Sequence, residues 1–210
     1  MKASFNYRSI FWSLLFGYFF YLMFEITVKY IPVSAHVAFL NIKQTEVTGI
    51  PFYLPVFYVH VLTSIFCLLA GFTQFNNSIL NKRPDIHRLI GKLYVGTILL
   101  FAAPSGLFIG LFANGGLFSR ISFIVLALLW FYFTLKAFTS IKQKDILSHQ
   151  KFMYRSFALT CSAITLRLWK VIIVYVFQPS PMDVYQIIAW LGWIPNILII
   201  EYYIAKKLIK

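Results

Sequence analysis

Histidine, arginine and small polar residues recur within the long apolar runs of this chain at helical spacing. Between His149 and Lys170 they follow intervals of four and three, which places them on one face of an α-helix. A polar face with a cation inside a membrane segment must meet protein or water, because lipid offers it no partner. This face comprises His149, Met153, Ser156, Thr160, Ala163, Arg167 and Lys170. The residues expected to face lipid are Phe152, Phe157, Leu159, Ile164, Leu166 and Leu168.

A second stretch repeats this pattern at spacings of four and three. Its small residues favour a helix–helix seam, because they let two backbones approach closely. A seam does not account for His60, which needs a hydrogen-bond partner or a ligand in a low-dielectric setting. The members of this second face are His60, Ser64, Cys67, Gly71, Gln74 and Ser78.

These faces belong to a chain of 210 residues that is 60% hydrophobic and only 12% charged, with a mean hydropathy of +0.77. The composition predicts an all-α polytopic membrane bundle, forming one domain over residues 1–210. About six transmembrane helices are expected, because long apolar runs alternate with short charged segments. The expected spans are Ile10–Val28, Leu54–Phe75, Leu89–Phe112, Ser119–Phe138, Phe152–Val176 and Tyr185–Ala205.

The lysines and arginines fall mainly on one side of these spans. Only Lys29, Lys43 and Arg120 lie in the segments expected outside, whereas the opposite segments, from Lys2 to Lys210, hold most of the others. The positive-inside rule therefore predicts cytoplasmic termini and an external Lys29–Tyr53 connection. The net charge of +13 comes largely from lysines and arginines between the apolar runs, where they determine membrane topology. We therefore expect no nucleic-acid partner.

The depth of each polar residue in the membrane can be estimated from its number of residues from the cytoplasmic rim, at about 1.5 Å per residue of helix. These depths divide the polar residues into two layers. His60 and Arg167 each come out about 22 Å above that rim and Ser105 about 24 Å, so they form an outer layer. The inner layer lies about 20 Å away. It comprises Gln74, His87, Arg88, His149 and Arg155, with Tyr94 on the helix face that follows His87.

Two polar layers that each contain histidine are typical of proteins that carry electrons between two b-type haems. Imidazoles from facing helices would ligate the iron, and Arg88, Arg155 and Arg167 would balance propionates. His87 and His149 each lie in the first turn of a helix that starts at the inner rim, so they are expected to approach one another. In the outer layer, His36 is the only second histidine available to His60.

The ordered set of residues from His60 to Arg167 resembles a family of bacterial multi-pass membrane proteins known only as a domain of unknown function. The resemblance implies a bundle in the bacterial cytoplasmic membrane, with a core over residues 54–176. A fainter likeness, to b-type di-haem transmembrane cytochromes, implies haem b. The residues that carry the family resemblance are Tyr58-Val59-His60, Gly71, Gln74, His87-Arg88, Gly91, Tyr94, Ala103-Pro104-Ser105-Gly106, Gly115-Gly116, Leu129-Trp130, His149, Met153, Arg155, Ser156, Leu159, Thr160, Thr165, Leu166 and Arg167.

Three functions follow as alternatives. The first is a membrane redox protein that binds haem b or a quinone between spans two and five and passes electrons to a redox partner, with His60, His87 and His149 as ligands or proton-coupled groups. The second is a small transporter or binder of an anionic or lipid-like ligand, in which Arg167 and Lys170 recognise the charge and His60 is a protonatable gate. The third is an accessory scaffold without chemistry of its own.

Overall fold

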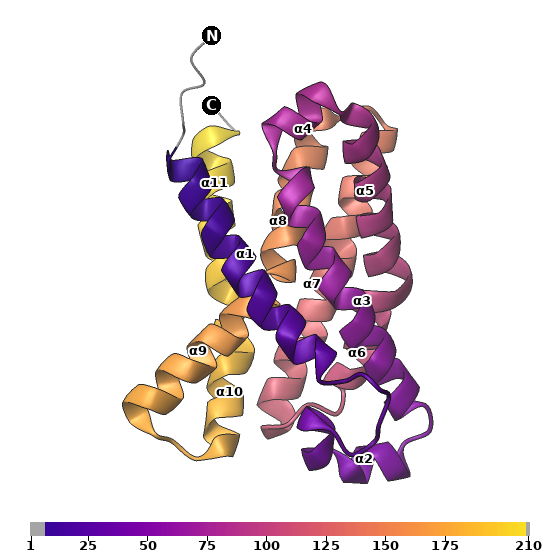
Figure 1. The fold of residues 1–210 in the computed structure, drawn as a ribbon, viewed down its shortest axis with the longest axis vertical. Coiled ribbons are helices and arrows are strands. Elements are labelled where there is room, and N and C mark those ends of the chain that lie inside the picture. Colours follow the sequence, from indigo (N-terminus) through magenta and orange to yellow (C-terminus); the bar gives the residue numbers. More distant parts are fainter. Residues whose placement is uncertain (1–6, 209–210) are drawn as a thin grey trace.

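The computed structural model describes residues 7–208, and every regular element within that range is a helix (Figure 1). Lys2 and Lys210, which contribute to the expected charge asymmetry, lie outside the described residues. In chain order the elements are α1 (Tyr7–Val28), η1 (Ala38–Ile42), α2 (Gln44–Gly49), α3 (Tyr53–Gln74), α4 (Asn77–Lys82), α5 (Pro84–Thr97), η2 (Ile98–Ala102), α6 (Ala103–Gly110), α7 (Gly116–Lys142), α8 (Ile146–Thr160), α9 (Ser162–Phe177), α10 (Pro181–Leu191) and α11 (Ile194–Lys207).

Six stretches of the described chain are long and apolar enough to cross a membrane, as predicted. Helices α1, α3 and α7 each form one span. The other three spans are composite: α5, η2 and α6 form the third, α8 and α9 the fifth, and α10 and α11 the sixth. The first described turn of α1 and the last of α11 lie at the same end of the bundle (Figure 1), as an even number of spans requires. The fold is therefore an all-α polytopic bundle.

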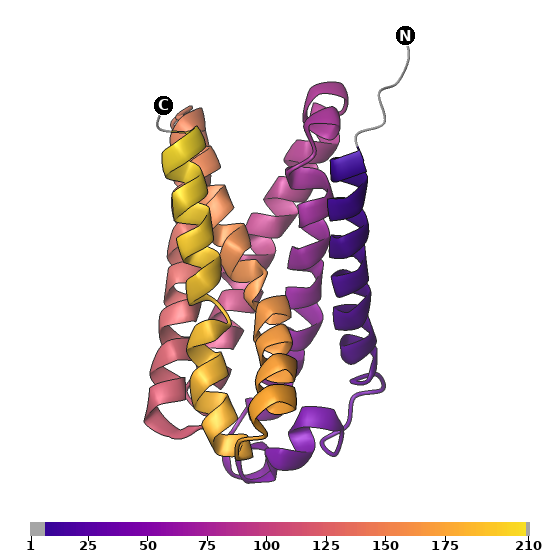
Figure 2. The same ribbon diagram turned by 90° about the vertical axis from the view of Figure 1, so that its left-hand side faces the viewer.

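The centre of the bundle is built from α3, α5, α6, α7 and α8, while α1 packs on the outside against α3 and α9 (Figure 2). Small residues allow close contacts: the ring of Phe157 lies where a Cβ on Gly71 would be. Leu159 and Ile164 are only 1% and 9% exposed. The prediction that they face lipid is wrong, because this span has protein on more than one side.

The fifth and sixth spans are both interrupted near their middle, at Cys161 and at Gly192–Trp193. The predicted span from Phe152 to Val176 is therefore built from two helices, and α9 leaves the axis of α8 (Figure 1). Breaks free backbone carbonyls, which must find partners inside a membrane. Asn196 donates to the carbonyl of Ala158 (3.1 Å) and to Thr165 Oγ1 (2.9 Å), and Thr165 in turn donates to the Gly192 carbonyl.

The third span contains the π-helical turn η2 directly before α6. Pro104 follows this turn and has no N–H to donate to the preceding turn. Such π-helical insertions are rare and often occur at functional sites. The last residue of η2, Ala102, presents its carbonyl to His60, as described below.

The connection between α1 and α3 folds over one end of the bundle, where η1 and α2 lie beneath the spans (Figure 1). Lys43 fixes it there. The Lys43 side chain is 2% exposed, and its Nζ donates to Glu46 Oε1 (2.6 Å) and to the carbonyl of Phe112 before α7. Lys43, which was expected to be an outer cation, is therefore buried and links this connection to the bundle.

Candidate functional site: a cationic cavity in the bundle

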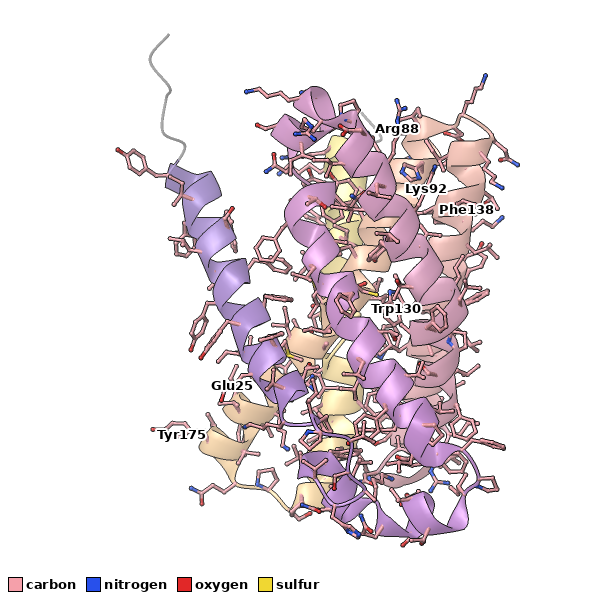
Figure 3. The ribbon with its side chains drawn as sticks, turned by 45° about the vertical axis from the view of Figure 1, so that its right-hand side comes forward. Glu25, Arg88, Lys92, Trp130, Phe138 and Tyr175 are labelled. Carbon is pink, nitrogen blue, oxygen red and sulfur yellow. The ribbon has the colours of Figure 1, made fainter. Side chains whose placement is uncertain are left out.

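A cavity of about 640 Å³ lies in the half of the bundle nearest η1 and α2, among α1, α3, α6, α7, α8, α9 and α10. Its volume is in the range that holds one small organic molecule. The described lining includes no carboxylate, and its basic side chains are Lys29, Lys43, His60, Arg167 and Lys170. Apolar side chains such as Met23, Leu68 and Trp130 form much of the remaining wall. Figure 3 shows Trp130 inside the bundle.

His60 is held at the cavity wall by the turn that ends η2. Its Nδ1 donates to the carbonyl of Ala102 (2.9 Å), and the hydroxyl of Ser105 lies 3.5 Å from the same nitrogen. A Cβ on Gly106 would lie 2.9 Å from His60 Cε1, so the imidazole can sit this close only because residue 106 is glycine. The expected outer-layer neighbours His60 and Ser105 are therefore together, although Ser105 itself is buried beside the cavity.

Arg167 reaches the same cavity from α9. Its guanidinium donates to the carbonyl of Ala163 one turn earlier (2.7 Å), and no ion pair to it occurs among the described residues. His60 lines the same cavity as Arg167. Arg167 thus lines the cavity inside the bundle, and its described hydrogen bond is to a backbone carbonyl of its own helix.

Tyr30, which lies just after α1, lines the cavity, and the pKa of its hydroxyl reflects both burial and nearby positive charge. Burial raises the pKa of its hydroxyl. The backbone N–H of Phe39 donates to this hydroxyl (3.3 Å). This hydrogen bond and the positive charge of Arg167 partly offset the rise in the pKa. Lys43 is neutralised by Glu46, whereas Lys29, Arg167 and Lys170 make no ion pair among residues 7–208. The cavity therefore carries uncompensated positive charge, which favours an anion.

The inner-layer histidines lie at the opposite rim of the bundle. His149 Nδ1 donates to the Ala137 carbonyl (2.8 Å), and Gln74 donates to the carbonyl of His87 (3.1 Å). His87 Nδ1 is buried without a described partner, and the imidazoles of His87 and His149 are near enough to interact electrostatically. No group of three metal-ligating acidic, cysteine or histidine side chains occurs within the described chain. Arg88 is exposed at this rim (Figure 3).

The other two predicted site residues serve the bundle itself. Arg155 pairs with Glu201 of α11 and lies against the rings of Phe133 and Phe152. The hydroxyl of Tyr94 lies 2.8 Å from Ser156 Oγ and 2.9 Å from Thr160 Oγ1, which joins α5 to α8. Neither Tyr94 nor Arg155 lines the cavity.

Sequence reasoning missed several residues of the cavity. Trp130, which the sequence singles out only through the family resemblance, lines the cavity and donates to Thr160 Oγ1 (3.0 Å). Lys43 and Glu46 were recognisable only as an i,i+3 pair in a connection that carries no periodic pattern. His36, the potential second ligand of the outer layer, is exposed and does not line the cavity.

Comparison with protein families matches residues 57–204 to the family described as "Predicted membrane protein (DUF2306)". This match covers more than half of the chain. The chain belongs to that family. No curated protein and no solved structure is significantly similar to it. The DUF2306 region runs from within α3 into α11, so it contains His60 and Arg167, whereas α1 and the connection that carries Lys43 lie before it.

Proposed function

We propose that this protein binds one anionic, amphipathic molecule in the cavity between its spans. The observation that carries this proposal is a space of about 640 Å³ whose described lining has no carboxylate and three cations without an ion pair among residues 7–208, namely Lys29, Arg167 and Lys170. A guanidinium on a membrane span without an ion pair is costly, so its position at the cavity wall supports a bound anion as its partner. Arg167 is the recognition charge, because it lies on a membrane span and makes no ion pair among residues 7–208.

The shape of the lining explains why the ligand is amphipathic. Lys29 directly follows α1 and Lys170 lies within α9, whereas Ile65 and Leu68 line the wall on α3. An anionic head therefore meets the basic side chains while an apolar body extends past α3. A neutral quinone fits this lining less well, because it would leave the charge of Arg167 uncompensated.

Binding is tested with the purified protein in a non-ionic detergent, using three probes that share one alkyl chain. Laurate should raise the unfolding temperature, whereas dodecanol and dodecylamine should not. In Arg167→Leu the affinity for laurate should fall at least about tenfold, because one charge-assisted hydrogen bond contributes about 1.5–3 kcal/mol. Arg120→Leu is the matched control, since Arg120 is exposed and does not line the cavity. Equal stabilisation by laurate and dodecanol would refute the proposal.

The paired helix breaks favour transport of the same ligand as a second candidate function. Interrupted spans in polytopic transporters place their broken ends at the substrate site. Here α9 begins at Ser162, which lines the cavity, and Ile188 of α10 also lines it. Uptake of a fluorescent fatty acid into proteoliposomes distinguishes the two, since a binding protein alone gives no protein-dependent flux.

A further inference from the structure

We infer that the occupant of the cavity is a single haem b, with His60 Nε2 as the only imidazole ligand of its iron and with the sixth coordination position open. This inference rests on the proposed anionic ligand and identifies it chemically. Haem is an amphiphile with two carboxylates at one edge of an apolar macrocycle, and it adds one requirement that a fatty acid lacks, namely an axial base.

The orientation of His60 supplies that base. The carbonyl of Ala102 can only accept a hydrogen bond, so Nδ1 carries the proton, and the neutral imidazole has its lone pair on Nε2. No described residue forms a hydrogen bond with His60 Nε2. This nitrogen is nevertheless not one of the fully buried unpaired atoms of the described chain, so it is accessible from the cavity that His60 lines. A histidine fixed through Nδ1 to a carbonyl is how proteins orient an imidazole toward a metal.

The remaining lining fits the rest of the group. The guanidinium of Arg167 donates to one backbone carbonyl and has further N–H groups for a carboxylate. Lys29 and Lys170 line the cavity and are exposed, so they offer cations for the second carboxylate. Leu68, Leu126 and Leu159 provide apolar walls for the macrocycle.

The histidine positions determine the coordination number. His36 is exposed and off the cavity, and His87 and His149 lie at the opposite rim, so His60 is the one imidazole on this wall. The proposal is therefore one haem with one histidine, and not the pair of haems of which two histidine-containing layers are typical. An open sixth position favours binding of a small exogenous ligand over simple electron transfer.

The test is titration of the purified protein with ferric haemin in dodecyl maltoside, followed by the Soret band and by electron paramagnetic resonance. Wild type should saturate at one haemin per chain with a high-spin ferric signal, and the dithionite-reduced form should bind carbon monoxide. His60→Ala should weaken binding at least tenfold and abolish the ligated spectrum. His60→Gly should regain it when imidazole is added, which a merely structural role of His60 would not permit. His36→Ala is the matched control and should behave as wild type.

Three results would overturn the inference: no saturable haemin binding, binding that is unchanged in His60→Ala, or a low-spin spectrum with two protein ligands. The outcomes also separate the two proposals. If laurate binding still depends on Arg167 but haemin binding is unchanged in His60→Ala, only the haem assignment is refuted. If Arg167→Leu binds both laurate and haemin as wild type does, the anionic site falls as well.

Discussion

Arg155 on α8 and Glu201 on α11 form a two-point ion pair that ties the fifth span to the sixth. Arg155 Nε donates to Oε1 (2.5 Å) and a terminal guanidinium nitrogen donates to Oε2 (2.8 Å). The Arg155 side chain is 19% exposed and that of Glu201 is 42% exposed, so the pair lies at the edge of the bundle. The pair joins α8 to α11, and neither residue lines the cavity.

Replacing either partner should therefore destabilise the fold without affecting ligand binding. Arg155→Met or Glu201→Gln should each lower the free energy of unfolding by about 1–2 kcal/mol, because solvent screening reduces the value of a half-exposed charged hydrogen bond. The double variant should cost less than the sum of the two. Denaturant unfolding in detergent, arranged as a double-mutant cycle, measures this coupling. Strictly additive losses would show that the pair contributes nothing.

The buried hydroxyl network around Thr160 should show an unequal response to removal of its members. In Tyr94→Phe, Thr160 keeps the indole of Trp130 and Ser156 keeps Thr134, so the loss should be about 1 kcal/mol. In Thr160→Val the indole N–H loses its acceptor inside the bundle, so the loss should be about 2–3 kcal/mol. Thermal unfolding of both variants tests the order, and a larger loss in Tyr94→Phe would contradict it.

Much of the fold follows from the sequence because spans are encoded by local properties. Apolar run length specifies the six spans, and helical spacing correctly placed Thr160 and Arg167 on an inward face. The break at Cys161 could not be predicted, since no proline or glycine marks it and the apolar pattern continues through it. The break near Gly192 does carry a signal, Gly192-Trp193-Ile194-Pro195.

The candidate site was only partly predictable for a related reason. His60 stood out because an ionisable group in a span needs a partner. Its partner is the backbone of Ala102, and carbonyls carry no sequence signal. Tyr94 and Arg155 share the polar pattern of a site but act as internal cross-links. Composition alone cannot distinguish a satisfied polar group from an open one, because that depends on neighbours brought together by the fold.

The start of α8 should make stability depend on acid pH through Asp145. Its carboxylate accepts from the backbone N–H of Ser148 (3.0 Å), and this bond, with the Ser148 side chain and Lys151, lowers the pKa of Asp145. A carboxyl with a depressed folded pKa stabilises the protein above its unfolded pKa of about 4 and loses that contribution as pH falls through the folded value. Asp145→Asn keeps the cap but not the charge. Its unfolding midpoint should approach that of wild type as pH falls from 5 to 2.5, whereas a constant gap would exclude this role.

The orientation in the membrane stays a prediction from the charge asymmetry, and the structure indicates where to probe it. Lys43 is buried, so a cysteine there would report poorly; Thr45 and Gln143 are exposed at opposite ends. In cells, an impermeant maleimide should label Thr45→Cys from the external side and should reach Gln143→Cys only after permeabilisation. Labelling with the opposite pattern would place both termini outside the cytoplasm.

The absence of a side chain at Gly106 should be essential for the position of His60. In Gly106→Ala the new Cβ would come within 2.9 Å of His60 Cε1, so the imidazole must move away from the Ala102 carbonyl. Haemin affinity should fall at least about tenfold, since the axial nitrogen would be displaced while the helix itself gains up to about 1 kcal/mol from alanine. Gly96→Ala is the matched control on the same span, because nothing lies within 4 Å of its added Cβ. The unfolding temperature and a haemin titration of both variants test this prediction. If Gly106→Ala stays folded and binds haemin as tightly as Gly96→Ala, haemin binding does not require His60 to be held in this position.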